Sequence, residues 1–436
     1  MKIYTYPSTS AGKKITSIVN RGIDVKKKDL LAVSRMIEDV RKNKDRALIN
    51  YTNRFDSPDL AIGSIQVTPK EFDHALKRVD RSFMKSLNRA VRQIESFHRQ
   101  QVSPSWINTE RPGTILGQMI RPVDAAGIYV PGGMRGKTPL VSSVIMGAVP
   151  AKVAGVNHIV MTTPPMKNGM VNAHLLAAAK KVGIDAVYKV GSAWAIAALA
   201  YGTETIPKVD VIVGPGNIYV AIAKKIVAGT VGIDMIAGPS EILIIADRTA
   251  NPEFIAADLL SQAEHDILAS SILVTDFPDI AKAVAAAVKK QIQKLSRKEI
   301  AEKALAKFGA IMVVADLDTA IELANQIAPE HLELQIKDPF SVVGRIHNAG
   351  AVFLGDYTPE PMGDYIAGPN HVLPTAGTAR FSSALSVDAF IKKISLIRYS
   401  RDAFGREAND VIRLAEIEGL DAHANSVKIR LSRFRK

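Results

Sequence analysis

The chain contains no cysteine among its 436 residues. This absence excludes disulfide bonds, thiolate ligands for zinc and iron–sulfur clusters. It also excludes a cysteine nucleophile, which is the usual group for trapping an aldehyde covalently before the aldehyde is oxidised. Any reaction of this protein that ends in a carboxylate must therefore use an activated water molecule.

Long apolar runs are also absent from the sequence. No stretch approaches the ~20 uninterrupted apolar residues that a membrane span needs, and the N-terminal segment MKIYTYPSTSAGKK lacks the apolar core of a secretory signal. Because 47% of the residues are apolar and 6% aromatic, the composition is typical of a soluble globular protein. We therefore expect a cytoplasmic enzyme with no membrane partner, built from two or three domains.

Acidic residues are outnumbered, which gives the chain a net charge of +13. Such a charge is compatible with nucleic-acid binding, a hypothesis that a gel-shift assay at several salt concentrations would test. However, the basic residues are dispersed, with clusters only at Lys26–Lys28 and in the tail KIRLSRFRK, and no zinc-finger or RNA-recognition motif is present. We therefore expect no nucleic-acid partner and interpret the charge as an attraction for anionic ligands such as a dinucleotide.

The N-terminal part of the chain is predicted to be mainly helical over residues 1–120. Apolar residues recur at helical spacing in DLLAVSRMIEDVRKNKDRALINYTNRF and in RSFMKSLNRAVRQIESFH. The sequence SIQVT between them predicts a short strand, and Thr68 followed by Pro69 marks the start of a further helix. We expect this part to contribute to the first α/β domain.

Short apolar strands alternate with helices from about residue 114 onwards, first over 121–237 and again over 238–376. This alternation predicts an α/β fold with two doubly wound, Rossmann-like and incomplete parallel-sheet domains, extended by helices at the N-terminus and the C-terminus. Residues 377–436 are predicted to form a C-terminal helical tail. Ligands in such folds favour the carboxyl ends of the strands, so we expect the sites there.

Four of the nine histidines, His265, His331, His371 and His423, lie beside carboxylates, amides or glycines. In LLSQAEHD, Gln262 and His265 are three residues apart, so one helical face can present an amide oxygen and an imidazole nitrogen together. This spacing recurs in metal-binding helices. On the spacing alone, a solvated polar helix end remains an alternative.

Two further motifs place a carboxylate beside a histidine. In IAPEHLEL, Glu330 and His331 are adjacent at the start of a predicted strand and can act as paired bases, although an exposed polar turn has the same pattern. In MGDYIAGPNHVLPTAG, Asp364 and His371 lie in a glycine-rich segment that lets the backbone approach a ligand. An aspartate that only stabilises its own turn is the alternative there.

The remaining motifs are weaker on their own. Glu418 and His423 in EIEGLDAH are also compatible with a helix end followed by a new helix. No GxGxxG motif is present for a dinucleotide. However, GPGNIY, from Gly214 to Tyr219, follows the predicted strand VDVIV and opens a helix, so its amides could meet a pyrophosphate. A purely structural turn remains equally compatible with this short motif.

Taken together, these motifs resemble the histidinol dehydrogenase family over nearly the whole chain. The stretches that carry the resemblance are GIYVPGG, VPAKVAGV, VGPGNIYVA, IDMIAGPSEILIIAD, AADLLSQAEHD, APEHLEL, NAGAVFLG, GPNHVLPT and EGLDAH, in the family's order and spacing. The sequence departs from the family at two places. Trp194 replaces a glutamine that contacts NAD, and an indole can stack on a ring but cannot accept a hydrogen bond. The turn MRGKTPLVSS after Gly133 is longer and more basic.

The resemblance implies an oxidation of L-histidinol through L-histidinal to L-histidine, the last steps of histidine biosynthesis, with NAD and one zinc ion per subunit. It assigns NAD binding to residues 121–237, the metal and catalytic residues to 238–376, and contact with the partner of an intertwined homodimer to the tail. The implied residues are Gln262, His265, Asp364 and the partner-donated His423 for zinc, Glu330 and His331 as bases, Ser240, His371 and Glu418 together with His331 and the zinc ligands for substrate, and Tyr129, Trp194 and Asn217 for NAD.

The implied mechanism needs two bases. His331 takes the hydroxyl proton while a hydride passes to NAD, and Glu330 then activates the water that hydrates the aldehyde for the second oxidation. Manganese or cobalt could replace zinc in such a nitrogen and oxygen ligand set. The closest alternative is a related dehydrogenase of another small alcohol, such as a hydroxysulfonate, but the complete ligand set with Glu418 and His423 favours an imidazole substrate.

Overall fold

The computed structural model describes residues 1–21, 25–132 and 138–433. Contacts divide the chain into two compact units. The first unit is Met1–Gln101 with Val123–Phe390, and the second is Val102–Pro122 with Ile391–Lys436. Among the described residues, no helix combines the length and the apolar character needed to cross a membrane.

A five-stranded parallel sheet in the first unit has the order β7-β6-β4-β8-β9. Its strands are β4 (Ala125–Tyr129), β6 (His158–Thr162), β7 (Ala186–Tyr188), β8 (Val211–Val213) and β9 (Gly232–Ile233), and a short β5 (Thr138–Pro139) lies outside it. In chain order the strands read 3-2-1-4-5, the arrangement of an incomplete Rossmann-like domain. The predicted α/β fold class is therefore confirmed for this half of the unit.

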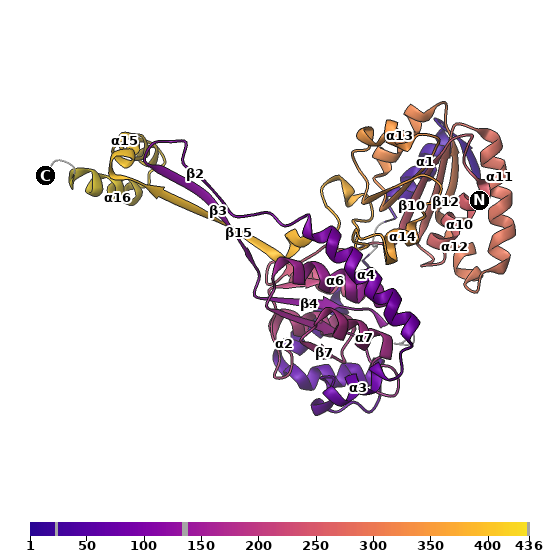
Figure 1. Ribbon diagram of the computed structural model, residues 1–436, viewed down its shortest axis with the longest axis horizontal. Helices are drawn as coiled ribbons and strands as arrows, with labels where there is room; N and C mark the ends of the chain where they lie inside the picture. The colour runs from indigo at the N-terminus through magenta and orange to yellow at the C-terminus, as the bar shows by residue number, and fades with distance from the viewer. Residues whose placement is uncertain (22–24, 133–137, 434–436) are drawn as a thin grey trace. The chain divides into compact units, whose positions relative to one another are not determined.

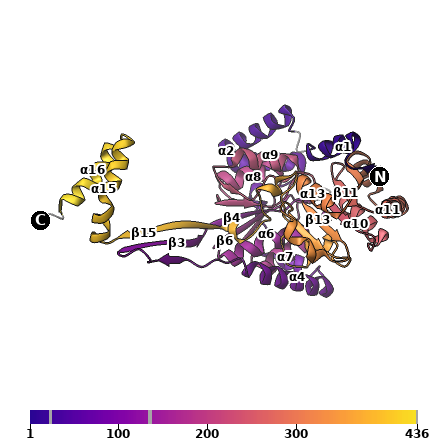
Figure 2. The same cartoon turned by 90° about the horizontal axis from the view of Figure 1, so that it is seen from above.

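Helices cover both faces of this first sheet (Figure 2). One face packs against α3 (Pro69–Leu76), α4 (Arg81–Arg99), α6 (Val141–Ala154) and α7 (Ala173–Val182). The other packs against α2 (Lys27–Phe55), α8 (Ser192–Tyr201) and α9 (Ile218–Val227). Because the strands are buried on both faces, they are nearly continuous apolar runs, as their sequences predict.

The start of α3 is where the sequence predicts it. The Thr68 hydroxyl accepts a hydrogen bond from the amide of Glu71, and the Glu71 carboxylate accepts one from the amide of Thr68. Pro69 is the first helical residue. The prediction of a strand over SIQVT is wrong. Only Gln66 forms a β-bridge, with Tyr188, because Pro69 has no amide to continue the ladder and begins a helix instead.

A second parallel sheet in the first unit has six strands in the order β1-β12-β11-β10-β13-β14. These are β1 (Ile3–Thr5), β10 (Glu241–Ala246), β11 (Ser270–Thr275), β12 (Gly309–Val313), β13 (His331–Gln335) and β14 (Ala351–Leu354). From β10 to β14 the order is again 3-2-1-4-5, so the fold repeats its topology. The predicted pair of doubly wound sheets is confirmed, and β1 adds a strand at one edge.

The second sheet is also covered on both faces (Figure 1). One face carries α1 (Thr9–Val19) and α13 (Leu317–Ile327), and the other carries α10 (Pro252–Ala263), α11 (Pro278–Gln291) and α12 (Lys298–Phe308). A short helix, α14 (Glu360–Tyr365), follows β14. The N-terminal residues thus serve both sheets, because β1 and α1 join the second sheet whereas α2, α3 and α4 cover the first.

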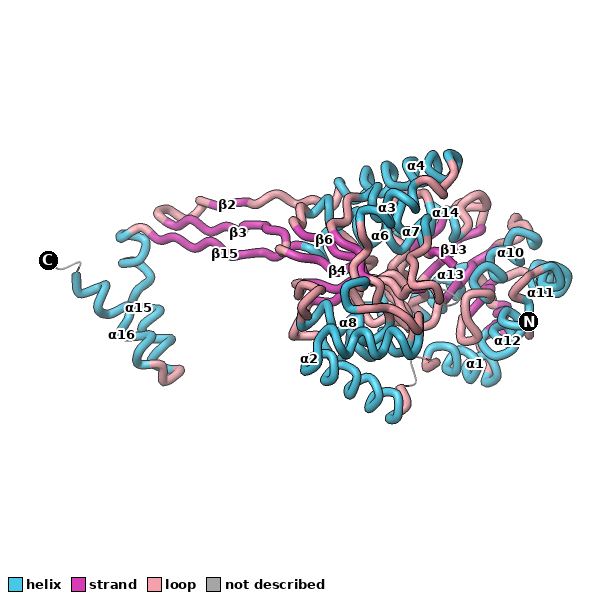
Figure 3. Tube along the Cα trace, turned by 90° about the horizontal axis from the view of Figure 1, so that it is seen from below, coloured by secondary structure: helices cyan, strands magenta, loops and turns pink. Residues whose placement is uncertain are grey.

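The second unit combines an antiparallel sheet with two helices (Figure 3). β3 (Thr114–Pro122) lies between β15 (Ile391–Tyr399) and β2 (Trp106–Asn108), and α15 (Arg401–Ile417) packs against α16 (Asp421–Ser432). The two tail helices are as predicted, but β15 is a strand that was not predicted within the helical tail of residues 377–436. Its partner β3 is far away in the sequence, so local periodicity could not reveal the pairing.

Candidate active site

The predicted bases lie at the amino ends of the strands of the second sheet. Glu330 directly precedes β13, His331 is its first residue, and Ser240 directly precedes β10. This corrects the expectation that the site would lie at the carboxyl ends. The reason is that α10 and α14 follow strands and return along the sheet, so each brings its last turn, with Gln262 or Asp364, back toward the amino ends.

His331 is held in a defined tautomer. Its Nδ1 lies 2.9 Å from the backbone oxygen of Glu241, and because a carbonyl only accepts, Nδ1 carries the proton. The other ring nitrogen, Nε2, is buried and has no hydrogen-bond partner among the described residues. Burial lowers the pKa of His331 to about 4, so the ring is neutral at physiological pH. Nε2 is therefore free to accept a proton.

Glu330 and Glu241 form a reciprocal pair across β10 and β13. The Glu241 amide donates to Glu330 Oε2 at 2.9 Å, and the Glu330 amide donates to Glu241 Oε2 at 3.2 Å. Burial raises the pKa of Glu330 well above its ordinary value, and the nearby Glu241 carboxylate raises it further. A carboxylate in this setting binds a proton more tightly than an exposed glutamate does.

The sequence does not predict Glu241 or its partner Arg21. The Arg21 guanidinium donates to Glu241 Oε1 at 2.7 Å, and both side chains are buried. Arg21 lies 220 positions away, so only the tertiary structure reveals the pair. The one local signal is an acidic residue at the start of a strand that is otherwise apolar, since Glu241 opens the run EILIIA.

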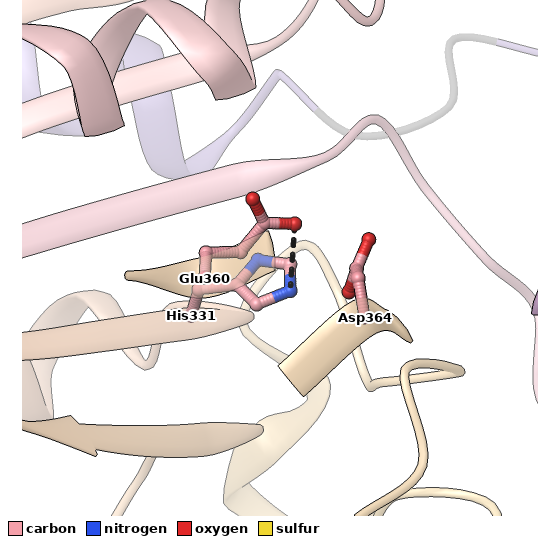
Figure 4. A group of neighbouring side chains, drawn as sticks. All are labelled: His331, Glu360 and Asp364. Carbon is pink, nitrogen blue, oxygen red and sulfur yellow. Dashed lines mark ion pairs between the residues drawn. The ribbon is translucent and has the colours of Figure 1, made fainter. Parts of the chain in front are cut away.

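Three acidic or imidazole side chains converge in front of β13 (Figure 4). His331, Glu360 and Asp364 each offer one ligand atom, and these atoms lie within 4.8 Å of one another. Glu360 Oε1 is 3.9 Å from His331 Nε2, and burial, followed by the charge of Asp364, raises the pKa of Glu360 to about 9. Glu360 was missed by the sequence analysis, although its i, i+4 spacing from Asp364 would have indicated a shared helix face.

The other predicted ligands lie around this group. Gln262 is fully buried, and neither its amide oxygen nor its amide nitrogen has a partner among the described residues. His265 lies one residue beyond the cap of α10 and is exposed. Nδ1 of His371 is 4.0 Å from Asp364 Oδ2, and its Nε2 is also buried without a described partner.

These unpartnered polar atoms indicate a ligand. A buried polar atom without a hydrogen bond costs about 1–3 kcal/mol, and several such atoms around one point would be stabilised by a bound group. Amide oxygen, imidazole nitrogen and carboxylate are the donors that zinc and similar divalent metals accept. The residues present therefore fit a divalent metal together with a polar substrate.

The predicted NAD residues lie at the carboxyl edge of the first sheet. Tyr129 ends β4. The Asn217 side chain caps α9 by accepting hydrogen bonds from the amides of Tyr219 and Val220. β4 and β8 are neighbours at the point where the strand order reverses, which is where dinucleotides bind in such sheets. The approach of the two loops is close, because a Cβ on Gly214, whose φ is +119°, would lie 2.1 Å from the Tyr129 carbonyl oxygen.

Trp194, the third residue predicted for NAD, lies in the interior of α8. Its indole nitrogen donates to Thr52 Oγ1 at 3.1 Å, and its ring stacks with Tyr51 and Phe55, each with centroids 5.7 Å apart. α2 therefore supplies its stacking partners in this structure, and a contact with NAD stays a prediction. The altered turn after Gly133 begins on residues 133–137, which lie outside the described part of the chain, and its second half forms β5 and the start of α6.

The two remaining predicted residues belong to the second unit. Glu418 is the cap residue that ends α15, and His423 lies in the first turn of α16. Both are exposed within the single chain. The structure thus groups Ser240, Gln262, His265, Glu330, His331, Asp364 and His371 around one sheet edge, and their individual roles stay predictions.

Comparisons with known proteins agree on one family. A profile described as histidinol dehydrogenase matches residues 20–431. Histidinol dehydrogenase of Desulfotalea psychrophila is 55% identical over 400 residues and covers 92% of both chains, and that of Syntrophotalea carbinolica is 51% identical over 431 residues and covers 99% of both. The crystal structure of the Elizabethkingia anophelis enzyme matches 100% of this chain and 99% of its own, at 39% identity, with a TM-score of 0.93. The chain therefore belongs to the histidinol dehydrogenase family, whose members are NAD-dependent oxidoreductases.

Proposed function

We propose that this protein oxidises L-histidinol through L-histidinal to L-histidine in two NAD-dependent steps, as the last steps of histidine biosynthesis in the cytoplasm. The observation that carries the proposal is the pair of different bases at one sheet edge. His331 presents a neutral, unpartnered Nε2, and Glu330 presents a buried carboxylate beside it. Oxidation of an alcohol and of a hydrated aldehyde each needs one base.

We assign the metal to Gln262, His265 and Asp364, with His423 as a further ligand, and the cofactor to Tyr129 and Asn217. Bound zinc would act as a Lewis acid that fixes the substrate nitrogens and favours deprotonation nearby. Bound NAD would accept one hydride in each step. Ser240, His371 and Glu418 are proposed to contact the substrate.

The protein's own residues move the protons. His331 Nε2 accepts the hydroxyl proton of the alcohol, because Nδ1 already donates to the Glu241 carbonyl and fixes the ring. Glu330 then accepts a proton from the water that adds to the aldehyde. The absence of cysteine agrees with this route, since a covalent thioester intermediate is impossible.

We also propose an intertwined homodimer in which His423 is donated by the partner subunit. The support is an unpartnered apolar stripe on α15 formed by Val411, Leu414 and Ile417, at spacings of three residues. Leu414 is 62% and Ile417 76% exposed within the single chain. A contiguous exposed apolar stripe is typical of a surface that another subunit covers.

The test is an assay of the purified protein with zinc, NAD and L-histidinol. We expect about two NAD to be reduced per histidinol, with histidine as the product, because each base serves one oxidation. Release of free aldehyde after a single NAD would contradict the two-step proposal. A hydroxysulfonate serves as the competing substrate, and preferential turnover of it would favour the alternative.

A further inference from the structure

Strand β13 carries a row of buried polar side chains beneath the proposed site. His331, Glu333 and Gln335 are two residues apart and therefore lie on one face of the strand. Leu332 and Leu334 point to the opposite face, into the core under α1 and α13. Glu333 is 1% and Gln335 2% exposed, and burying such groups is costly unless they are hydrogen-bonded.

Two helices present matching pairs to this row. On α10, Asp258 and Gln262 are four residues apart, and on α14, Glu360 and Asp364 have the same spacing, so each pair lies on one helix face. The second member of each pair is a proposed zinc ligand. The first member lies one turn away and meets the polar row of β13.

Hydrogen bonds join the strand to both helices. Gln335 Nε2 donates to Asp258 Oδ2 at 2.8 Å and to Glu333 Oε2 at 2.9 Å. The carboxyls of Glu333 and Asp258 thus accept from the same amide nitrogen. The backbone amide of Glu360 donates to Glu333 Oε1 at 3.0 Å.

The last link leads from this network to the proposed metal ligand. The carboxylate oxygens of Glu360 and Asp364 lie within 4.8 Å of each other. Among the described residues, no lysine or arginine pairs with the carboxyls of Asp258, Glu333 or Glu360. The layer is therefore held together by hydrogen bonds between its own members rather than by ion pairs with basic side chains.

We propose that Asp258, Glu333 and Gln335 form a layer of positioning residues that fixes α10 and α14 on β13 and thereby places Gln262 and Asp364 for zinc. This inference rests on the proposed zinc site. Apolar packing alone lets a helix shift along a sheet, whereas directional hydrogen bonds to two helices from adjacent side chains do not. Residues that orient metal ligands in this way typically change metal affinity by about 10–100-fold when they are replaced.

The test is Glu333→Leu in the full-length protein, with zinc affinity measured by competition against a chromogenic chelator. We expect about 10–100-fold weaker zinc binding and a KM for histidinol that rises more than the KM for NAD. Glu333→Gln keeps the size and one acceptor oxygen and should recover most of the zinc affinity. If Glu333 only stabilised the fold, its replacement would not raise the KM for histidinol more than the KM for NAD.

Ser271→Ala is the matched control, because Ser271 Oγ donates to the Leu259 backbone oxygen on α10 from β11, which β10 separates from β13, outside the layer. It should lower the Tm and leave zinc affinity unchanged. If Glu333→Leu does not fold, Gln335→Met takes its place, because it removes both amide hydrogen bonds at similar volume. The same loss of zinc affinity is expected from it. A folded variant with wild-type zinc affinity would overturn the inference alone, whereas a wild-type protein that binds no zinc would overturn the proposed metal site and the inference together.

Discussion

At the scale of single residues, the neighbourhood of His331 and Glu330 decides their chemistry. The Glu241 backbone fixes the histidine tautomer through its carbonyl and orients the Glu330 carboxylate through its amide. Arg21 in turn holds the Glu241 side chain. One residue of β10 therefore positions both proposed bases, so that replacing either base should remove one proton transfer without displacing the other.

We expect separable losses from the two bases. His331→Asn should slow alcohol oxidation by ~10²–10⁴-fold, the usual loss of a general base, because it removes the buried, unpartnered Nε2 that is proposed to accept the hydroxyl proton. Glu330→Gln should chiefly slow the oxidation of added histidinal. Stopped-flow measurement of NADH formation from each substrate distinguishes the steps, and near-normal aldehyde turnover in Glu330→Gln would reduce that residue to a structural neighbour.

Asp56 gives a stability prediction outside the group of residues around His331. Burial raises its pKa from 3.8 to about 6, and one of its carboxylate oxygens has no partner among the described residues. Because the folded state holds this proton more tightly than the unfolded state, the contribution of Asp56 to stability is full below pH ~4 and is lost as pH rises through about 6.

Asp56→Asn should therefore be more stable than the wild type above pH 7, by on the order of 1–2 kcal/mol after allowance for screening. Near pH 4 the difference should vanish. Urea unfolding at the two pH values measures the effect, and the exposed neighbour Asp59→Asn is the control. Equal stabilities of wild type and Asp56→Asn at pH 8 would show that the carboxylate is not strained by burial.

At the scale of elements, the loop from β8 to α9 is held against the end of β4. The amide of Gly214 donates to Asp234 at 2.8 Å, and its carbonyl accepts from Lys224 at 2.9 Å. Lys224 and Asp234 form a buried ion pair with each other. This arrangement fixes the loop next to Tyr129, where we propose that NAD binds, and leaves no room for a side chain at position 214.

Gly214→Ala should raise the KM for NAD and lower stability by more than about 1–2 kcal/mol, because it adds a steric overlap with the Tyr129 carbonyl to the cost of a positive φ. Gly229→Ala separates the steric overlap from the cost of a positive φ. Gly229 also has a positive φ, +93°, but a Cβ there meets nothing within 4 Å. If both variants lose the same stability and keep wild-type affinity for NAD, the close approach of the loops has no functional role.

At the scale of the whole molecule, the second unit carries groups that a single chain leaves exposed. Glu418 and His423 lie on the surface of the helix pair, as do the apolar residues of α15. Ile397 of β15 is also 71% exposed. These exposed polar and apolar groups support the proposed homodimer.

Complementation tests the proposed shared site. His423→Ala and His331→Asn chains should each form inactive homodimers, whereas a heterodimer purified through two different tags should recover part of the activity. In that heterodimer, one site combines an intact His331 with an intact His423 from the opposite chain. A heterodimer no more active than either homodimer would place His423 in the site of its own chain.

The sequence by itself determined the fold class, and it predicted most of the proposed site residues but not Glu241 or Glu360. Strands such as β8 (VIV) and β10 (ILIIA after Glu241) are apolar because both of their faces are buried, and this pattern is local. Motifs such as LLSQAEHD and APEHLEL keep their chemistry within a few residues. The helix starts at Thr68 and Asn251 were equally visible, because capping depends on adjacent residues.

Only the tertiary structure decided which distant residues meet. The amino-end location of the site depends on where α10 and α14 return along the sheet. The pairing of β15 with β3 joins segments far apart in the chain, and so do the bond between Arg21 and Glu241 and the polar layer around Glu333. Such contacts depend on how the elements pack, and no local spacing encodes them, because a buried polar residue has the same sequence pattern as a solvated one until its partners are known.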